Sequence, residues 1–505
     1  MSPYLVIAPI LIQFLISVTL MFLWKQVMAQ RIFSIIGSGI ALIFSIALFS
    51  QVWQKGTLVM QAGNWEAPFG ITLVSDTFSA TLVLLTGIVG MAISIFAAGS
   101  VVNARARFGF FPILHFLFMG LCGSFLAGDI FNLYVWFEII IISSFVLLTI
   151  GGEKAQIEGA VKYFTLNILA SIIFLTAIAV LYGITGTLNM ADLSLKIAAI
   201  EDKTLVNICA MIFFVGFGIK SAVFPLYFWL PASYHTPPHA VAAIFGGLLT
   251  KVGVYAMIRV FTLIFTLDPF LENIIMGVAI LTLFSGAVGA LVQRNLQKIF
   301  SYLIICHIGF MVAGLGMGST IALTGAIFYM IHDIVVKANL FMVGGLLYRI
   351  NGTSNIKRMG DMYSRYPMLS LLMAVPLFSL VGIPPLSGFW PKLSLIMGGL
   401  ETGNYVLIGF LLFASFITLF IIAKVWAEVF WKKKEVVTST FPFRFFEAHS
   451  QQEKILMLIP IIFLGIISLG IGFGAGPVQS LSERISIELS DVSGYINVVL
   501  GDKSN

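Results

Sequence analysis

The sequence predicts an all-α polytopic membrane protein with about fourteen transmembrane helices, and three observations support this fold class. Of the 505 residues, 59% are hydrophobic and only 10% are charged, and the mean hydropathy is +1.04, whereas soluble domains carry about 25% charged residues. The apolar residues form runs of roughly 18–28 residues, the length that a helix needs to cross a bilayer. The charges in the connecting loops alternate along the chain.

The predicted spans follow one another with mostly short loops between them. The closest pair, 110–127 and 129–150, is separated only by a tight turn at Gly128–Asp129. Two spans, 205–230 and 368–398, contain prolines in their interior, so we expect each to be a broken helix. The fourteen spans are 4–24, 32–52, 76–101, 110–127, 129–150, 160–183, 205–230, 239–262, 272–292, 299–316, 320–348, 368–398, 403–430 and 455–475.

Loop charge supports this count independently of hydropathy. Loops after odd-numbered spans carry Lys and Arg, as in Lys432, Lys433 and Lys434 after the thirteenth span, whereas loops after even-numbered spans are poor in basic residues. Basic loops stay on the cytoplasmic side, so both termini are predicted outside the cell. The net charge of +6 therefore does not indicate nucleic-acid binding. Because no basic residue precedes the first span, we expect a retained helix rather than a cleaved signal.

The two broken spans resemble each other. GIKSAVFPLYFWLP at 218–231 contains Pro225, and GIPPLSGFWPK at 382–392 contains Pro384 and Pro385. Both stretches have Gly-Ile, then proline, then Phe-Trp, with a lysine at one end. They lie five spans apart, so five-helix units built around them would have opposite orientations in the bilayer. Inverted repeats with one broken helix each are typical of transporters.

Ionisable residues lie in the middle of several predicted spans, at similar depths; Glu138, for example, lies ~14 Å into its span. Each such charge costs about 2.5–3.5 kcal/mol on insertion scales, so we expect these groups to pair, hydrate or titrate. A row of titratable groups across the membrane plane is the predicted arrangement, with snorkelling lysines or structural ion pairs as the alternatives. The residues are Glu138, Lys220, Lys251, His332, Asp333, Lys337 and Lys392.

Within this row, Glu138 is expected to pair with Lys220. A carboxylate changes the proton affinity of a neighbouring lysine, so separating the two would move a proton on or off Lys220. A purely structural buried pair is the alternative, although such pairs seldom add stability.

The histidines are less specific signals. His332 lies near Lys337 in the same span and is a candidate proton relay, whereas Asp333 points off that face and is expected to pair with a neighbouring helix. His307 could relay protons or be a hydrogen-bonded core residue. His235 and His239 flank Pro237–Pro238 in a cytoplasmic turn, where a proton funnel and an ordinary loop role are both open. Near the end of span thirteen, Lys424 and Glu428 have the i, i+4 spacing of a structural ion pair.

No motif in the sequence indicates catalysis. There is no phosphate-binding loop, no Cys-x-x-Cys pair, no haem or iron–sulfur ligand set, and no nucleophile with an oriented base. Cys122, Cys209 and Cys306 all fall within apolar spans without metal-ligand spacing. We therefore expect no cofactor and no metal, and energy that comes from an ion gradient or from a partner protein.

At these residues the chain resembles the antiporter-like subunits shared by respiratory complex I and the Mrp-type multisubunit cation/proton antiporters. The resemblance covers nearly the whole chain. It rests on Glu138, Lys220 at the first break, Lys251, His332 with Lys337, and Lys392 at the second break, where one complex I homologue carries glutamate instead.

The resemblance implies two inverted five-helix repeats, at 110–262 and 272–430, preceded by three helices at 1–101. Residues 431–505 would form a cytoplasmic loop, a last helix and a tail, and the loop 431–454 is expected either to lie on the membrane surface or to be solvated. The implied function is proton translocation along the row, coupled to Na⁺ export and supporting sodium and alkali tolerance. The chain would work with other small membrane subunits in a bacterial cell membrane. The alternative is a proton-pumping membrane subunit of a redox complex, either complex I or a membrane-bound hydrogenase.

Overall fold

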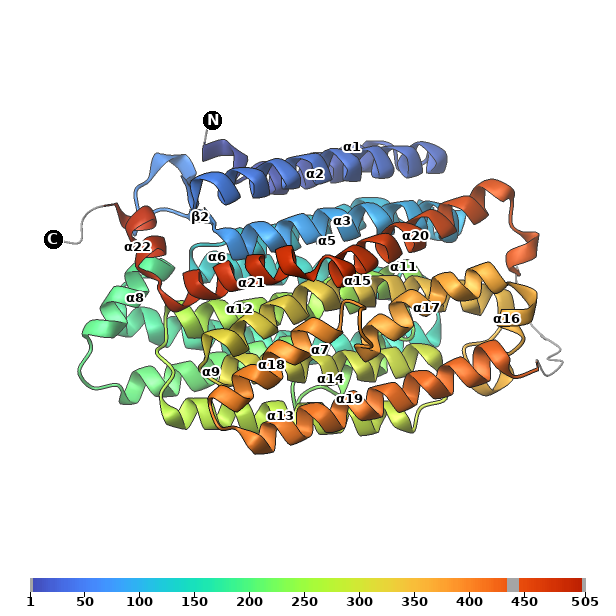
Figure 1. The fold of residues 1–505 in the computed structure, drawn as a ribbon. Helices are drawn as coiled ribbons and strands as arrows, with labels where there is room; N and C mark the ends of the chain where they lie inside the picture. Colours follow the sequence, from blue (N-terminus) through green and yellow to red (C-terminus); the bar gives the residue numbers. More distant parts are fainter. Residues whose placement is uncertain (1–2, 434–444, 502–505) are drawn as a thin grey trace.

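The computed structural model describes residues 3–433 and 445–501. Figure 1 shows a bundle of long helices that lie roughly side by side, with α1 and α2 at one edge and α13 and α19 at the opposite edge. A two-stranded antiparallel hairpin, in which Leu58 pairs with Ser75, joins α2 to α3. The first elements are α1 (Ala8–Phe22), α2 (Val27–Lys55), β1 (Leu58–Gln61), β2 (Thr72–Ser75), α3 (Thr77–Ser100) and α4 (Asn103–Arg107).

The remaining helices follow in three groups. From the first predicted repeat come α5 (Phe110–Leu126), α6 (Ile130–Thr149), α7 (Lys154–Thr185), α8 (Met190–Ala199), α9 (Thr204–Ser221), α10 (Trp229–Ser233), α11 (His239–Ile244), the π-helical turn η3 (Phe245–Leu249) and α12 (Thr250–Leu263). From the second come α13 (Pro269–Leu291), α14 (Leu296–Gly316), α15 (Thr320–Asn351), α16 (Met362–Arg365), α17 (Pro367–Val381), α18 (Phe389–Glu401), α19 (Tyr405–Trp426) and the π-helical turn η5 (Ala427–Trp431). The chain then forms α20 (Gln451–Phe473), α21 (Ala475–Ser490) and α22 (Ser493–Leu500). Single 3₁₀ turns lie at Pro3–Leu5, Ala62–Asn64, Ile356–Arg358 and Phe446–Ala448.

The prediction of fourteen apolar helices is confirmed within the described residues. Eleven helices are long and apolar enough to cross a membrane, and α1, α5 and α17 are shorter apolar helices, which makes fourteen. The continuous helix α11–α12 and α15 are buried throughout their most apolar 18-residue window, whereas α2, α7, α13 and α19 are buried over less than two fifths of theirs. The helices that carry most of the predicted charges therefore lie inside the bundle, and the apolar outer helices face the lipid.

Both predicted helix breaks are confirmed. After α9 the chain turns through Ala222, which has a left-handed φ of 62°, and after α17 it turns through Gly382 with φ of 83°. Pro225 lies in the segment between α9 and α10, and Pro384 and Pro385 lie between α17 and α18. Proline supplies no backbone donor and clashes with the preceding helical turn, so neither helix can continue past these positions.

Four elements were not expected from the sequence, namely the β-hairpin, α8, α21 and α22. Each is short or polar, so none gives the long apolar run that predicts a membrane span. The loop prediction for 431–454 falls largely outside the described residues, since 434–444 are not described.

The expected pair between Lys424 and Glu428 is wrong. Glu428 Oε2 lies 3.5 Å from Lys432 Nζ instead, and Lys424 Nζ donates to the backbone oxygen of Leu291 at 3.4 Å. The π-helical turn η5, which begins at Ala427, widens the helix there and changes which side chains face one another.

Candidate functional site

The centre of the site is a buried cluster of three charged or titratable side chains from three helices. Lys251 Nζ of α12 lies 2.6 Å from Asp333 Oδ2 of α15. The other carboxylate oxygen of Asp333 lies 3.1 Å from His307 Nδ1 of α14. None of the three side chains is exposed. The expectation that Asp333 pairs with a neighbouring helix is confirmed, and His307 is a hydrogen-bonded member of the cluster.

A distortion of the helix backbone contributes to the same cluster. Lys251 Nζ also donates to the backbone oxygen of Gly246 at 2.8 Å, in the π-helical turn η3. A π-turn is wider than an α-turn and frequently occurs at functional sites. The ammonium of Lys251 therefore has a carboxylate and a backbone carbonyl as partners, as a charge far from water requires.

Lys220 occupies the last turn of α9, directly before the first break, and is 6% exposed. Its Nζ donates to Ser171 Oγ of α7 at 3.1 Å and lies 4.7 Å from the centre of the Phe137 ring. The lysine also lines a cavity of about 20 Å³ with Tyr163 and Asn167, which has room for one water molecule.

The structure does not join Glu138 directly to Lys220. Glu138 follows Phe137 on α6 and is half-buried, and within residues 3–433 and 445–501 no ion pair joins its carboxylate to Lys220. One oxygen of that carboxylate, Oε1, is buried without a hydrogen-bond partner. The expected direct pair is therefore absent from this conformation.

The second break is surrounded by three of the predicted residues. His332 Nδ1 of α15 lies 2.8 Å from Ser387 Oγ in the break. Lys392 Nζ donates to the backbone oxygen of Val381, the last residue of α17, at 2.7 Å. Lys337 is fully buried on α15, and its Nζ has no hydrogen-bond partner among the described residues. A lysine thus lies at each break, Lys220 before the first and Lys392 after the second.

His235 and His239 both line a polar cavity of about 540 Å³ at the ends of α3, α7 and α15. His235 Nδ1 donates to the backbone oxygen of Pro231 at 2.9 Å, and His239 Nε2 lies 3.3 Å from Gln297 Nε2. Burial, together with the positive charge of Lys298, lowers the pKa of His235 to about 4. Their role as a proton funnel stays a prediction.

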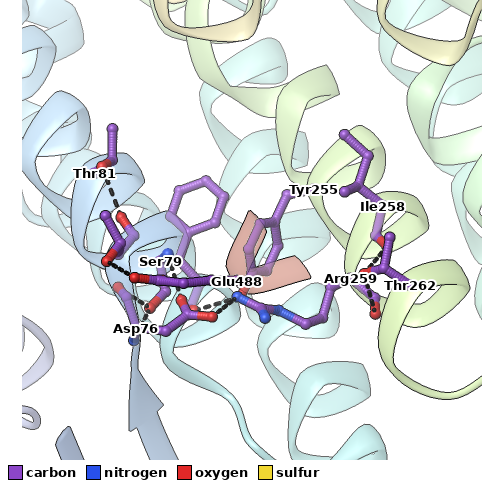
Figure 2. A network of polar contacts seen from close by, with 10 residues as sticks. Asp76, Ser79, Thr81, Tyr255, Ile258, Arg259, Thr262 and Glu488 are labelled. Atoms are coloured by element: carbon purple, nitrogen blue, oxygen red, sulfur yellow. Dashed lines mark hydrogen bonds and ion pairs between the residues drawn. The ribbon is translucent and has the colours of Figure 1, made fainter. Parts of the chain in front are cut away.

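Sequence analysis missed a second buried polar network, shown in Figure 2. Arg259 of α12 and Asp76, the N-cap of α3, point toward one another, and their closest atoms lie 2.5 Å apart with both side chains almost fully buried. The guanidinium also lies between 5.4 and 5.7 Å from the rings of Phe78, Tyr255 and Tyr495. An arginine inside the predicted span 239–262 was the signal that could have revealed it.

The second missed group is His115 of α5, which is fully buried. Its Nδ1 lies 2.7 Å from Gln13 Oε1 of α1, and its Nε2 lies 2.9 Å from Ser34 Oγ of α2. An amide oxygen only accepts, so Nδ1 carries the proton and Ser34 donates to Nε2. Both ring nitrogens are satisfied, which fits a role in fastening α1 and α2 to the bundle.

Among the described residues, no group of three or more His, Cys, Asp or Glu side chains is arranged to hold a metal ion. Cys122, Cys209 and Cys306 are free and buried.

Comparison with known proteins decides the family. Residues 127–418 match the family model described as NADH:quinone oxidoreductase/Mrp antiporter, transmembrane. The chain belongs to this family. Among curated members, it is 42% identical over 501 residues to an Na(+)/H(+) antiporter subunit of Alkalihalophilus pseudofirmus, with 98% of this chain and 99% of that protein covered. It is 38% identical over 496 residues to the subunit of the same name from Bacillus subtilis, with 98% and 99% covered.

Solved structures agree on the fold. A chain of the Mrp complex from Dietzia superposes with a TM-score of 0.91 at 26% identity, covering 99% of this chain and all of the other. A chain of the archaeal membrane-bound sulfane sulfur reductase gives 0.89 at 26% identity, again with 99% and 100% covered. A chain of respiratory complex I from Thermus thermophilus gives 0.80 at 20% identity over 97% of this chain and all of that one, and that likeness concerns the fold alone.

Proposed function

We propose that this family member is a proton-translocating subunit of a hetero-oligomeric cation/proton antiporter that couples proton uptake to Na⁺ export. The curated relatives named as Na⁺/H⁺ antiporter subunits align with nearly the whole chain, which supports the antiporter as the setting. In this function the chain is a transporter subunit rather than an enzyme.

The observation that carries the proposal is the pair between Lys251 and Asp333. It lies where no side-chain atom of either residue is exposed and connects a helix of the first predicted repeat to a helix of the second. Buried ion pairs give little net stability compared with apolar packing, so stability alone does not account for this one. Ionisable groups inside membrane proteins mark ion and proton pathways.

The proposed path runs from Lys220 through Lys251 to His332 and Lys337 and then to Lys392. Glu138 would act by approaching and leaving Lys220, and the absence of a direct contact in this conformation is then one of two positions. Each break supplies a segment in which the backbone is not fully hydrogen-bonded and the adjacent lysine can meet water.

The proposal includes the setting of the chain. The units at 110–262 and 272–430 would be the two inverted repeats, with both termini outside a bacterial cell membrane. The half-exposed position of Glu138 and the apolar surfaces of the outer helices support contact with other membrane subunits and with lipid.

The experiment uses the complete antiporter complex in inverted membrane vesicles, where Na⁺-driven proton movement is followed with a pH-sensitive dye. Glu138→Ala and Lys220→Ala are each expected to abolish transport while the subunit still assembles at the normal level. Lys196→Ala is the control, because this lysine lies on α8 in a partly exposed pair with Asp192. Wild-type transport in either path variant at normal assembly would overturn the mechanism.

The second candidate, a proton-pumping subunit of a redox complex, is favoured by the likeness to the sulfane sulfur reductase chain. Purification of the tagged chain from its native membrane separates the two. Small hydrophobic subunits without cofactors in the eluate support the antiporter, whereas flavin, iron–sulfur or nickel proteins support the redox complex.

A further inference from the structure

Helix α20 lies outside both predicted repeats, yet it contributes a hydroxyl to the second break. Ser468 Oγ of α20 lies 3.1 Å from Ser387 Oγ and 3.2 Å from Ser379 Oγ of α17. Ser387 Oγ in turn lies 2.8 Å from His332 Nδ1. All four side chains are completely buried. A continuous chain of hydrogen bonds therefore connects α20 to a residue of the proposed proton path.

The direction of these hydrogen bonds follows from the number of protons available. A serine hydroxyl has one proton to donate, and Ser468 donates its proton to Ser379. Ser387 must then be the donor to Ser468, which leaves Ser387 only as an acceptor toward His332. The proton of neutral His332 is therefore on Nδ1, and its Nε2 carries a free lone pair.

The surroundings of His332 Nε2 agree with this assignment. This nitrogen is buried and has no hydrogen-bond partner among the described residues. It faces the backbone of Gly388 in the break, where a Cβ added to the glycine would lie only 3.0 Å from it. A larger residue at position 388 would therefore press against the free nitrogen.

The two breaks differ in a way that points to the same helix. In the first break, Trp229 Nε1 donates to the backbone oxygen of Ile219, at the end of the helix that precedes the break, at 3.0 Å. In the second, Trp390 Nε1 donates to the backbone oxygen of Gly472 on α20 at 2.9 Å. The first break is thus closed by its own segment, whereas the second depends on α20 at both Ser468 and Gly472.

We propose that Ser468 is a positioning residue for proton transfer at His332, because the chain Ser379–Ser468–Ser387 holds the imidazole in the Nδ1–H form with Nε2 free to accept a proton. This inference rests on the proposed function of the His332 region. The charged groups whose fields act on His332 are Asp333, Lys337, Lys251 and Lys392, and α17 and α20 add the serine hydroxyls. A proton that binds Nε2 gives the imidazolium, and the same nitrogen releases it onward.

The test compares Ser468→Ala with Ser468→Thr, which keeps a hydroxyl, in the complete complex reconstituted into lipid. Solid-state NMR with ¹⁵N-labelled histidine reports the tautomer, and the signal of His332 is the one that disappears in His332→Gln. We expect the Nδ1–H form in the wild type and in Ser468→Thr, and a mixture of tautomers in Ser468→Ala. Ser387→Ala should produce the same mixture by breaking the chain at its other link.

Transport is the second readout. In Ser468→Ala we expect Na⁺-driven proton movement to fall by about tenfold or more, since a positioned proton acceptor contributes roughly 10²–10⁴ to a transfer rate, and its pH optimum to move. Ser468→Thr should restore both. The matched control is Ser482→Ala on α21, because that serine is equally buried and donates only to the backbone oxygen of Val478 in its own helix.

Two results would overturn the inference, namely an unchanged His332 tautomer in Ser468→Ala, or a changed tautomer with wild-type transport and pH profile. Failure of the proposed function looks different, because Glu138→Ala and Lys220→Ala would then keep wild-type transport. The tautomer measurement would still decide whether α20 positions His332.

Discussion

Lys251 Nζ and Asp333 Oδ2 lie 2.6 Å apart with no exposed surface on either side chain, and this contact joins α12 to α15. The second oxygen of Asp333 is taken by His307, so one carboxylate serves two titratable partners from two helices. Any proton that reaches or leaves Lys251 changes the charge of the whole cluster. The pair therefore has both a structural and an electrostatic consequence, and variants can separate them.

Asp333→Asn is expected to leave the Lys251 ammonium without its counter-charge. Removing one partner of a buried pair costs about 3–5 kcal/mol, so we expect both a lower level of assembled complex and loss of transport. Native gel electrophoresis of solubilised membranes measures assembly, and dye-based Na⁺-driven proton movement measures transport. The double variant Lys251→Met with Asp333→Leu removes both charges and should recover assembly but not transport. Recovery of both would show that the pair has only a structural role.

Lys392→Ala should reduce transport by at least about tenfold, because it removes the titratable group at the second break. Lys392→Glu is expected to be partly tolerated, since another ionisable group would then occupy the position. Inverted vesicles matched for subunit content give the rates. Lys55→Ala, at an exposed end of α2, is the control. Wild-type rates in Lys392→Ala would remove this residue from the path.

The network around Arg259 should control stability. Asp76→Asn is expected to lower the apparent unfolding temperature of the purified complex by about 5 °C or more, because it leaves a buried guanidinium without its carboxylate. Glu488→Gln should have a smaller effect, since that side chain is half-buried and lies in the outer part of the network. Thermal unfolding of detergent-solubilised complex, followed by intrinsic fluorescence, checks both. An equal loss in the two variants would contradict the assigned importance of the Asp76–Arg259 pair.

The loop at 231–238 should open more readily in acid. The pKa of His235 lies at about 4 in the folded loop because of burial and the nearby Lys298, with Lys162 and Glu158 as further charged neighbours, against an ordinary value of about 6.5. The opened loop therefore binds a proton more readily than the closed one. Closure is at full strength above about pH 6.5 and is lost as the pH falls toward 4. His235→Asn keeps a donor for Pro231 and should remove this pH dependence.

Hydrogen–deuterium exchange of peptides that cover 231–238, corrected for the intrinsic effect of pH, measures the opening. The wild type should show falling protection between pH 6.5 and 4, and His235→Asn should show a flat profile. The same pH dependence in both proteins would assign it to another group.

The sequence was sufficient to predict the fourteen apolar helices and both breaks, because hydropathy, loop charge and proline act locally. It also predicted that Asp333 would find a partner on another helix, since a lone carboxylate in that span is costly. It could not identify Lys251 as that partner. The contact depends on how α12 and α15 are packed and on the π-helical turn beside Lys251, neither of which has a local sequence signal.

The misses have similar causes. Glu138 and Lys220 have complementary charges at similar depths, but the conformation of Lys220 is set by Ser171 and Phe137, which lie on other helices. The expected Lys424–Glu428 pair failed because the helix changes its period at η5. The Ser468 chain was not predictable, because serine is common in apolar helices and gives no signal until its neighbours are known.

The polar helix α21 has a consequence for how such a protein can move. Its Glu488 accepts a hydrogen bond from Thr77 at the start of α3, and its Ser486 donates to the backbone oxygen of Thr320 at the start of α15. Its neighbour Arg484 donates to the backbone oxygen of Trp53 at the end of α2. One strap therefore fastens the ends of helices from three parts of the chain. Rocking of one half against the other, the usual form of alternating access, would break this strap, so we expect conduction through local rearrangements of side chains and water inside a stationary frame.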